Sequence, residues 1–105
     1  MKHSVIPSEK FKKEFKRLSK KYPSLKAELL ELNAELEENP THGTALGNNT
    51  YKIRLAIKGK GKSGGSRVIT YVISENEEVY LLTMYDKSEF DTIDDKSIEQ
   101  IIDSL

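Results

Sequence analysis

The sequence has 105 residues, no cysteine, 36% hydrophobic and 32% charged residues, and a formal net charge of zero. This length supports one modest core, so we expect a single domain over residues 1–105. The lack of cysteine excludes disulfides, thiolate zinc sites and a cysteine nucleophile. No apolar run approaches the roughly 20 residues that span a bilayer, and the first ten residues lack the apolar stretch of a secretory signal. A cytoplasmic protein without membrane contact is the simplest interpretation.

The neutral total hides four blocks of alternating charge. Residues 1–27 carry +7, residues 28–50 carry −5, residues 51–72 carry +6 and residues 73–105 carry −8. Attraction to a polyanion depends on the local field, so nucleic acid stays open as a ligand. The alternative is a solvated face without a binding role, and this is the favoured interpretation for residues 10–21.

The first forty residues predict a short strand and two helices. Residues 3–7 favour a β conformation and end at a proline, which is typical of an edge strand. Ser8 suits the N-cap of a helix that runs to about Lys21, with apolar residues 11, 15, 18 and 22 on one stripe. Leucines 25, 29, 32 and 36 repeat this spacing in a second helix, which ends at Asn39. Together they predict a helical hairpin that needs an apolar surface.

The rest of the chain predicts a loop, three strands and a helix. Residues 41–50 are rich in Gly, Asn and Thr, which indicates a loop. Strands are expected at 51–58, 67–73 and 78–85, the last nearly all apolar and therefore central. A short helix then begins at Asp94 or Asp95. The order β-α-α-β-β-β-α defines an α+β fold in which an antiparallel, twisted sheet packs on the N-terminal helical hairpin.

Alternation within residues 51–58 predicts which side chains face water. If the hairpin covers Ile53 and its apolar neighbours, Lys52, Arg54 and Lys58 project from the opposite side. The loop 59–66 adds Lys60 and Lys62, and Arg67 opens the next strand. Repulsion among these cations is tolerable in water and is relieved when phosphate arrives. A flexible loop with solubilising lysines is the alternative.

Cofactor motifs are absent or misleading. Residues 59–64, GKGKSG, fit GxGxxG and imitate part of a P-loop, but both motifs must open a helix, and a β-branched strand follows here. His3 and His42 stand alone, and neither histidines nor carboxylates show metal-ligand spacing. We therefore expect no small-molecule cofactor and no metal.

If the protein is an enzyme, its chemistry must come from Lys, Arg and Tyr side chains. RNA supplies its own nucleophile, the 2′-hydroxyl. An endoribonuclease must deprotonate it, stabilise the phosphorane-like charge and protonate the leaving 5′-oxygen. Clustered cations perform the second step, and crowding favours a neutral lysine that can act as base or acid. Tyr71 and Tyr85 are typical half-buried strand aromatics, though either could stack a base.

The stretch YKIRLAIKGKGKSGGSRVITYV, followed by VYLLTMYDKSE, resembles the RelE/ParE superfamily of type II toxin–antitoxin toxins. It looks closest to the HigB-like branch, with its basic KxR strand, Gly/Lys-rich hairpin, GGxRVIxY and YLLTxYxKxE. The match is specific over residues 51–90 and elsewhere rests on element order. The resemblance implies a metal-independent endoribonuclease that cuts mRNA in the ribosomal A site, inhibits translation and is held inactive by a cognate antitoxin.

The resemblance also implies roles for individual residues. Lys52 and Arg54 contact the scissile phosphate and help to transfer protons, Arg67 stabilises the transition state, and Lys87 has a similar phosphate role. Some relatives carry a tyrosine near the final helix, where this sequence has none in residues 90–93, and Tyr85 is the substitute candidate. The expected contacts to RNA or the ribosome come from Lys58, Lys60, Lys62 and Tyr71.

Two other functions stay open within the same superfamily. One is a ParE-like inhibitor of DNA gyrase, which uses the fold without RNA chemistry. The other is a folded but inactive member that an antitoxin still binds. Retention of the four basic site residues argues against the gyrase inhibitor, which has no need for that set.

Overall fold

The computed structural model describes residues 2–60, 64–90 and 92–105. The elements are β1 (Ser4–Pro7), α1 (Glu9–Lys21), α2 (Leu25–Glu38), β2 (Thr44–Gly47), β3 (Thr50–Leu55), β4 (Ser66–Ile73), η1 (Ser74–Asn76), β5 (Glu78–Asp86) and α3 (Asp95–Asp103). The strands form one sheet in the order β1-β5-β4-β3-β2, in which only the β1–β5 pair is parallel. This arrangement confirms the predicted α+β class, the edge position of β1 and the β3-β4-β5 meander.

Strand β2 lies within the segment that we expected to be a loop, so that prediction was wrong for residues 44–47. Asn48 and Asn49 have φ values of 51° and 64°, which suit the tight turn that joins β2 to β3. Every residue of β2 is exposed, so no alternation of apolar and polar residues marks it in the sequence. Strand β3 ends at Leu55, earlier than the predicted residue 58.

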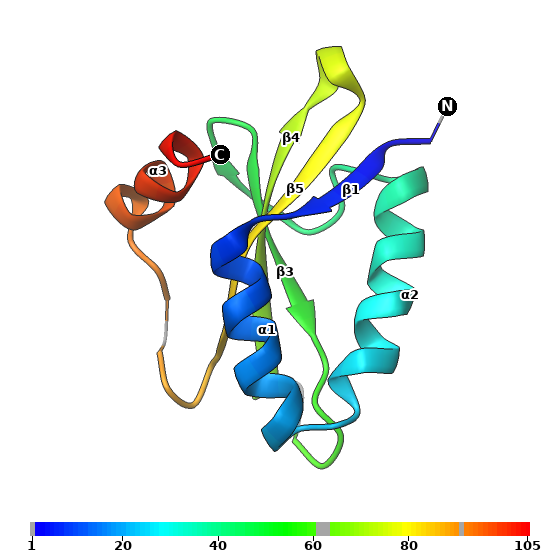
Figure 1. Cartoon of the computed structure of the whole chain (residues 1–105), viewed down its shortest axis with the longest axis vertical. Coiled ribbons are helices and arrows are strands. Elements are labelled where there is room, and N and C mark those ends of the chain that lie inside the picture. Colours follow the sequence, from blue (N-terminus) through cyan, green and yellow to red (C-terminus); the bar gives the residue numbers. More distant parts are fainter. Residues whose placement is uncertain (1, 61–63, 91) are drawn as a thin grey trace.

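The helical hairpin covers one face of the sheet, as predicted. Phe11 and Leu18 of α1 and Leu25, Leu32 and Leu36 of α2 are buried. They pack in one cluster with the sheet residues Ile53, Leu55, Val68, Val72, Val79, Leu81 and Met84. Each such side chain contributes about 1.5–3 kcal/mol when it is fully buried. In Figure 1, α1 crosses in front of the sheet and α2 stands to its right.

Ser8 fixes the start of α1 against the sheet. Its Oγ accepts a hydrogen bond from the backbone N–H of Phe11 at 3.0 Å and donates one to the carbonyl oxygen of Leu82 at 2.7 Å. One buried hydroxyl therefore caps the helix and ties it to β5, in agreement with the predicted N-cap.

Helix α3 covers part of the opposite face. Ile98 packs with Ile69, Leu82 and Tyr85 in a second, smaller cluster. The register of β4 and β5 shifts between Ile69 and Thr70, where β5 carries one extra residue and bends. The sheet residues in this cluster come from β4 and β5. On the same face of β3, Arg54 is exposed and Lys52 is half-buried. In the described part of the chain, no helix is long and apolar enough to cross a membrane.

Candidate functional site

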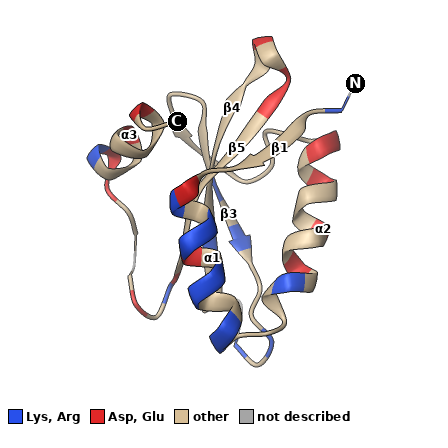
Figure 2. Ribbon diagram, in the orientation of Figure 1, with Lys and Arg blue, Asp and Glu red and all other residues tan. Residues whose placement is uncertain are grey.

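The strand register brings site residues from three strands into one row. Arg54 on β3 lies opposite Arg67 on β4, and Arg67 lies opposite Tyr85 on β5. Side chains of directly opposite residues start about 4.5–5.5 Å apart and share a face. Lys52 stands two residues before Arg54 and therefore projects from that face as well. Figure 2 shows Lys and Arg positions in blue on β3, beside the basic helix α1 in this view.

Arg67 is buried, and in the described chain no carboxylate balances its charge. Its side chain is only 7% exposed, and its Nη1 donates to the carbonyl oxygens of Gly64 and Ser66, each at 3.0 Å. Across the described ranges it forms no ion pair with a carboxylate. Two like charges directly opposite each other destabilise a sheet, and a buried charge is costly. The pair Arg54–Arg67 is therefore better suited to hold an anion than to stabilise the fold.

Lys87 extends this row at the end of β5. Its backbone N–H donates to the carbonyl oxygen of Gly65 at 3.0 Å, which continues the β4–β5 ladder by one residue. Lys87 is half-buried and is the first residue of the turn after β5. The register therefore places Lys52, Arg54, Arg67 and Tyr85 on one face, with Lys87 at the adjoining end of β5.

Tyr85 lies at the boundary between this face and a cavity. The side chain is 5% exposed, and its hydroxyl has no hydrogen-bond partner among the residues that the structure describes. Burial raises the pKa of Tyr85, against the smaller effects of Thr92 and the Arg67 charge. The cavity of about 600 Å³ is lined by residues of α1, the end of β5 and the segment before α3. The Tyr85 hydroxyl is thus a buried polar group without a partner in the described structure, on a residue that lines the cavity.

Tyr71 lies farther along β4. It is four residues from Arg67, or about 13 Å along the strand, and it packs in the cluster beneath α3. It opposes Tyr80 on β5 and Thr50 on β3. Its half-buried ring therefore does not join the cationic row, although it lies on the same face.

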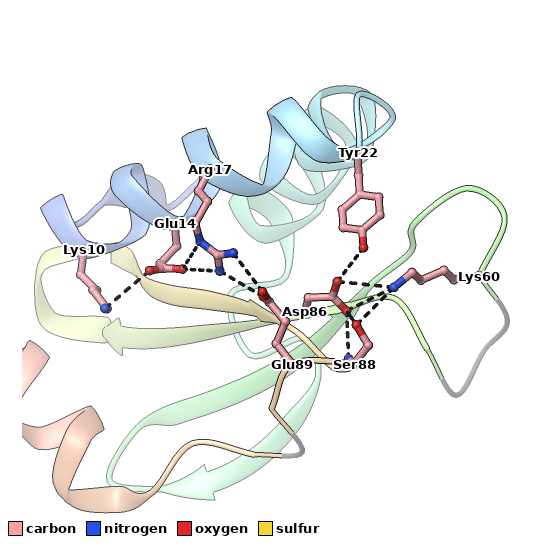
Figure 3. A network of polar contacts seen from close by, with 8 residues as sticks. All are labelled: Lys10, Glu14, Arg17, Tyr22, Lys60, Asp86, Ser88 and Glu89. Atoms are coloured by element: carbon pink, nitrogen blue, oxygen red, sulfur yellow. Dashed lines mark hydrogen bonds and ion pairs between the residues drawn. The ribbon is translucent and has the colours of Figure 1, made fainter.

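Lys58 and Lys60 differ in their surroundings. Lys58 is exposed, and Lys62 lies outside the described residues. The Nζ of Lys60 is 3.4 and 3.5 Å from the two carboxylate oxygens of Asp86 and lies 4.9 Å from the ring centroid of Tyr22. Interaction with Tyr22, followed by the charge of Asp86, raises the pKa of Lys60. Figure 3 shows this side chain turned toward the helical hairpin.

Asp86 has an organising position that we did not predict from the sequence. The last residue of β5 is fully buried, and its carboxylate accepts hydrogen bonds from Tyr22 and Ser88. Burial alone raises the pKa of a carboxyl, but the Ser88 and Tyr22 bonds and the Lys60 charge lower that of Asp86 to about 2. An acidic residue at the end of an otherwise apolar strand was the available signal.

A second ion-pair network fixes the segment after β5. Arg17 on α1 bonds both carboxylate oxygens of Glu89 at 3.1 Å and also reaches Glu14 at 2.9 Å. These bonds raise the pKa of the Arg17 guanidinium further. These ion pairs join α1 to the segment after β5 (Figure 3). Glu14, Arg17 and Glu89 also line the cavity that Tyr85 borders.

The described residues contain no cluster of three or more His, Asp or Glu side chains that could hold a metal ion. His42 instead pairs with Glu35, with 3.3 Å between Nδ1 and Oε1.

The fold and this face define a small α+β protein whose sheet presents clustered cations without carboxylate partners in the described chain. A family model for the RelE toxin of the RelE/RelB toxin–antitoxin system matches residues 10–103. The chain belongs to this family of toxins, which pair with an antitoxin.

A solved structure supports the same fold. The free Escherichia coli toxin RelE, studied as a double arginine-to-alanine mutant, aligns with a TM-score of 0.69 and 19% sequence identity. The alignment covers 100% of this chain and 99% of that chain. The expected superfamily is confirmed, and assignment to the HigB-like branch stays a prediction.

Proposed function

We propose that this RelE-family toxin is an endoribonuclease that cleaves mRNA on the ribosome without a metal cofactor. The observation that carries the proposal is the cross-strand pair Arg54–Arg67. Arg67 is buried, and within the described chain its guanidinium bonds only carbonyl oxygens. A scissile phosphate would supply the negative charge that this pair lacks.

Cleavage uses the 2′-hydroxyl of the substrate. Removal of its proton lets the oxygen attack the adjacent phosphorus, which forms a 2′,3′-cyclic phosphate and expels the 5′-oxygen as a protonated hydroxyl. Negative charge grows on the phosphate oxygens in the transition state. Fixed cations lower the barrier because they are already oriented when the charge develops.

We assign a role to each of the five candidate residues on β3, β4 and β5 and at the end of β5. Arg67, whose guanidinium is held by two carbonyl oxygens, stabilises the transition state. Lys52 and Arg54 contact the scissile phosphate and take part in proton transfer, and Lys87 contacts the phosphate from the end of β5. The Tyr85 hydroxyl, next to Arg67 in the register, orients the nucleotide or its 2′-hydroxyl.

Residues around the row supply binding. Lys58 is exposed and attracts phosphate, and we extend the same role to Lys62, which lies outside the described residues. Lys60 contributes less charge to this surface because it interacts with Asp86. Tyr71 offers a partly exposed ring on the same face for base stacking.

The antitoxin is the proposed protein partner, and ribosomes that carry mRNA are the proposed target. Because ribosomes that carry mRNA are cytoplasmic, we also propose that the toxin acts in the cytoplasm. The HigB-like branch is the subfamily that we propose.

Induced expression in bacteria tests the function. We expect growth arrest, mRNA cuts within A-site codons, and cleavage of mRNA on purified ribosomes but not of the free transcript. Trapped gyrase–DNA breaks would instead identify a ParE-like inhibitor. Normal growth in a susceptible host, with the antitoxin still bound, would identify an inactive member.

A further inference from the structure

Among the residues that the structure describes, Asp86 is a buried ionisable residue that the proposed reaction does not use. It ends β5 with its carboxylate on the side of the helical hairpin, next to Tyr22, and Lys87 is the first residue of the turn that follows. Aspartate is rarely buried without partners, because water no longer solvates its charge. Asp86 has no exposed surface, so its partners must justify its position.

The carboxylate joins three segments that are far apart in the sequence. Oδ2 accepts the hydroxyl of Tyr22, at the end of α1, at 2.8 Å. Oδ1 accepts the N–H and the hydroxyl of Ser88 at 2.9 and 2.8 Å. The ammonium of Lys60, at the neck of the glycine-rich loop, lies within 3.5 Å of both oxygens. Figure 3 shows these side chains converging on Asp86.

Backbone hydrogen bonds hold the chain at Lys87 and at the residue that follows it. The N–H of Lys87 donates to Gly65, and the next N–H, that of Ser88, donates to the Asp86 carboxylate. The N–H groups of Glu89 and Phe90 donate to the Asp86 carbonyl oxygen at 2.9 and 3.1 Å, which closes the turn. The position of Lys87 therefore depends on Asp86.

Arg67 lies near the start of β4, which pairs with this end of β5. Gly65, which accepts from Lys87, stands between Gly64 and Ser66, whose carbonyl oxygens hold the Arg67 guanidinium. The loop neck is anchored a second time, since the N–H of Lys58 donates to the hydroxyl of Ser24 at 3.3 Å. A shift of the turn after β5 would therefore change the spacing of Lys87 and Arg67.

We propose that Asp86 is a positioning residue of the ribonuclease site, which holds Lys87 and the neck of the basic loop at a fixed spacing from Arg67. It acts from the opposite face of the sheet and does not touch the RNA. This inference rests on the proposed function. It also assigns Lys60 an anchoring role, in place of the RNA contact expected from the sequence.

Asp86→Asn is the central test. The amide keeps the size of the side chain and one accepting oxygen, but it removes the charge that faces Lys60 and one of the two acceptors. In single-turnover cleavage on programmed ribosomes, we expect the rate at saturation to fall about 10- to 100-fold, as for a misplaced catalytic group. The ribosome concentration at half saturation should change less than about twofold, because the binding cations remain. Asp103→Asn, an exposed substitution of equal charge, should match the wild type.

A double-mutant cycle with Lys87→Ala separates positioning from general damage. If Asp86 acts through Lys87, Asp86→Asn should change cleavage less than about twofold once Lys87 is alanine. Independent, multiplicative losses would overturn the proposal, as would a wild-type rate for Asp86→Asn. If Asp86→Asn does not fold, Lys60→Met and Tyr22→Phe each remove one partner of the carboxylate. Each should then lower the rate about three- to tenfold with the same dependence on Lys87.

Amide hydrogen exchange distinguishes failure of this inference from failure of the proposed function. If the wild type does not cut mRNA, the ribonuclease proposal fails, but exchange still measures the turn. Faster exchange at Lys87 and Ser88 in Asp86→Asn, with the core strands unchanged, supports the positioning role. Unchanged exchange at both amides overturns it.

Discussion

Arg54 on β3 and Arg67 on β4 lie directly opposite each other on the face of the sheet that the helical hairpin leaves uncovered. One guanidinium is exposed and the other is buried, so the pair offers a phosphate both a fixed and an adjustable partner. Repulsion between the two positive charges destabilises the sheet, and a bound phosphate would relieve it.

Removal of the two basic residues nearest the strand end should abolish cleavage. Arg67→Ala with Lys87→Ala is expected to lower the single-turnover rate at least about 100-fold, the usual cost of one lost transition-state donor. The melting temperature should stay near that of the wild type, because the substitution also removes the repulsion between Arg54 and Arg67. Lys26→Ala, at an exposed position of α2, is the control. Undiminished cutting by the double variant would refute the site assignment.

Binding to ribosomes should weaken steeply with salt. The logarithm of the binding constant is expected to fall linearly with the logarithm of salt concentration, because each neutralised phosphate releases counterions. Lys52→Ala and Arg54→Ala should each reduce the slope by about 1, whereas Lys26→Ala should leave it unchanged. A slope that stays flat in the wild type would exclude the cationic row as the contact surface.

The two tyrosines Tyr85 and Tyr22 should respond oppositely to the loss of a hydroxyl. Tyr85→Phe removes a buried hydroxyl that has no partner in the described structure, so the free energy of unfolding should rise by about 1 kcal/mol. Tyr22→Phe removes a hydrogen bond to a buried carboxylate and should lower it by about 1.5–3 kcal/mol. Urea unfolding measures both. A several-fold slower cleavage by the more stable Tyr85→Phe would assign the hydroxyl a part in the reaction.

Acid should remove the stabilisation that Asp86 provides. Its folded pKa of about 2 lies below its ordinary value of 3.8, so the contribution is complete above about pH 5. It is lost as the pH falls toward 2 and amounts to about 2 kcal/mol. The difference in unfolding free energy between wild type and Asp86→Asn should therefore shrink over this range. A difference independent of pH between 5 and 2 would contradict the charged state of Asp86.

Two glycines allow a matched test of the backbone behind Lys52. Gly43 has φ +105°, and an added Cβ would lie 2.6 Å from the carbonyl oxygen of Lys52. Gly47 has φ +92° but open space around it. Gly47→Ala should cost about 1–2 kcal/mol for the positive φ alone. Gly43→Ala should cost more, because Lys52 and Ile53 would have to move. Equal unfolding free energies would show that the close approach is relaxed without cost.

The side of β3 on which the cations lie was predictable from the residue pattern, because alternation is a local property. Ile53 and Leu55 face the hairpin, and Lys52 and Arg54 therefore face away, as expected. Strand β2 escaped prediction because its residues are all exposed, and exposed strands lack the apolar repeat that marks β3. The direction of Lys60 could not be predicted either, since its partner stands 26 residues later.

The sequence by itself therefore determined the two helices, the meander and the side of β3 on which the cations lie. These follow from periods of 3.6 and 2 residues and need no knowledge of distant partners. Tertiary structure alone decided that Arg67 is buried opposite Arg54, that Lys60 faces Asp86, and that Asp86 ties Ser88 and the turn after β5 to the loop and α1. Register and long-range hydrogen bonds depend on how separate elements pack, and no local pattern encodes that packing.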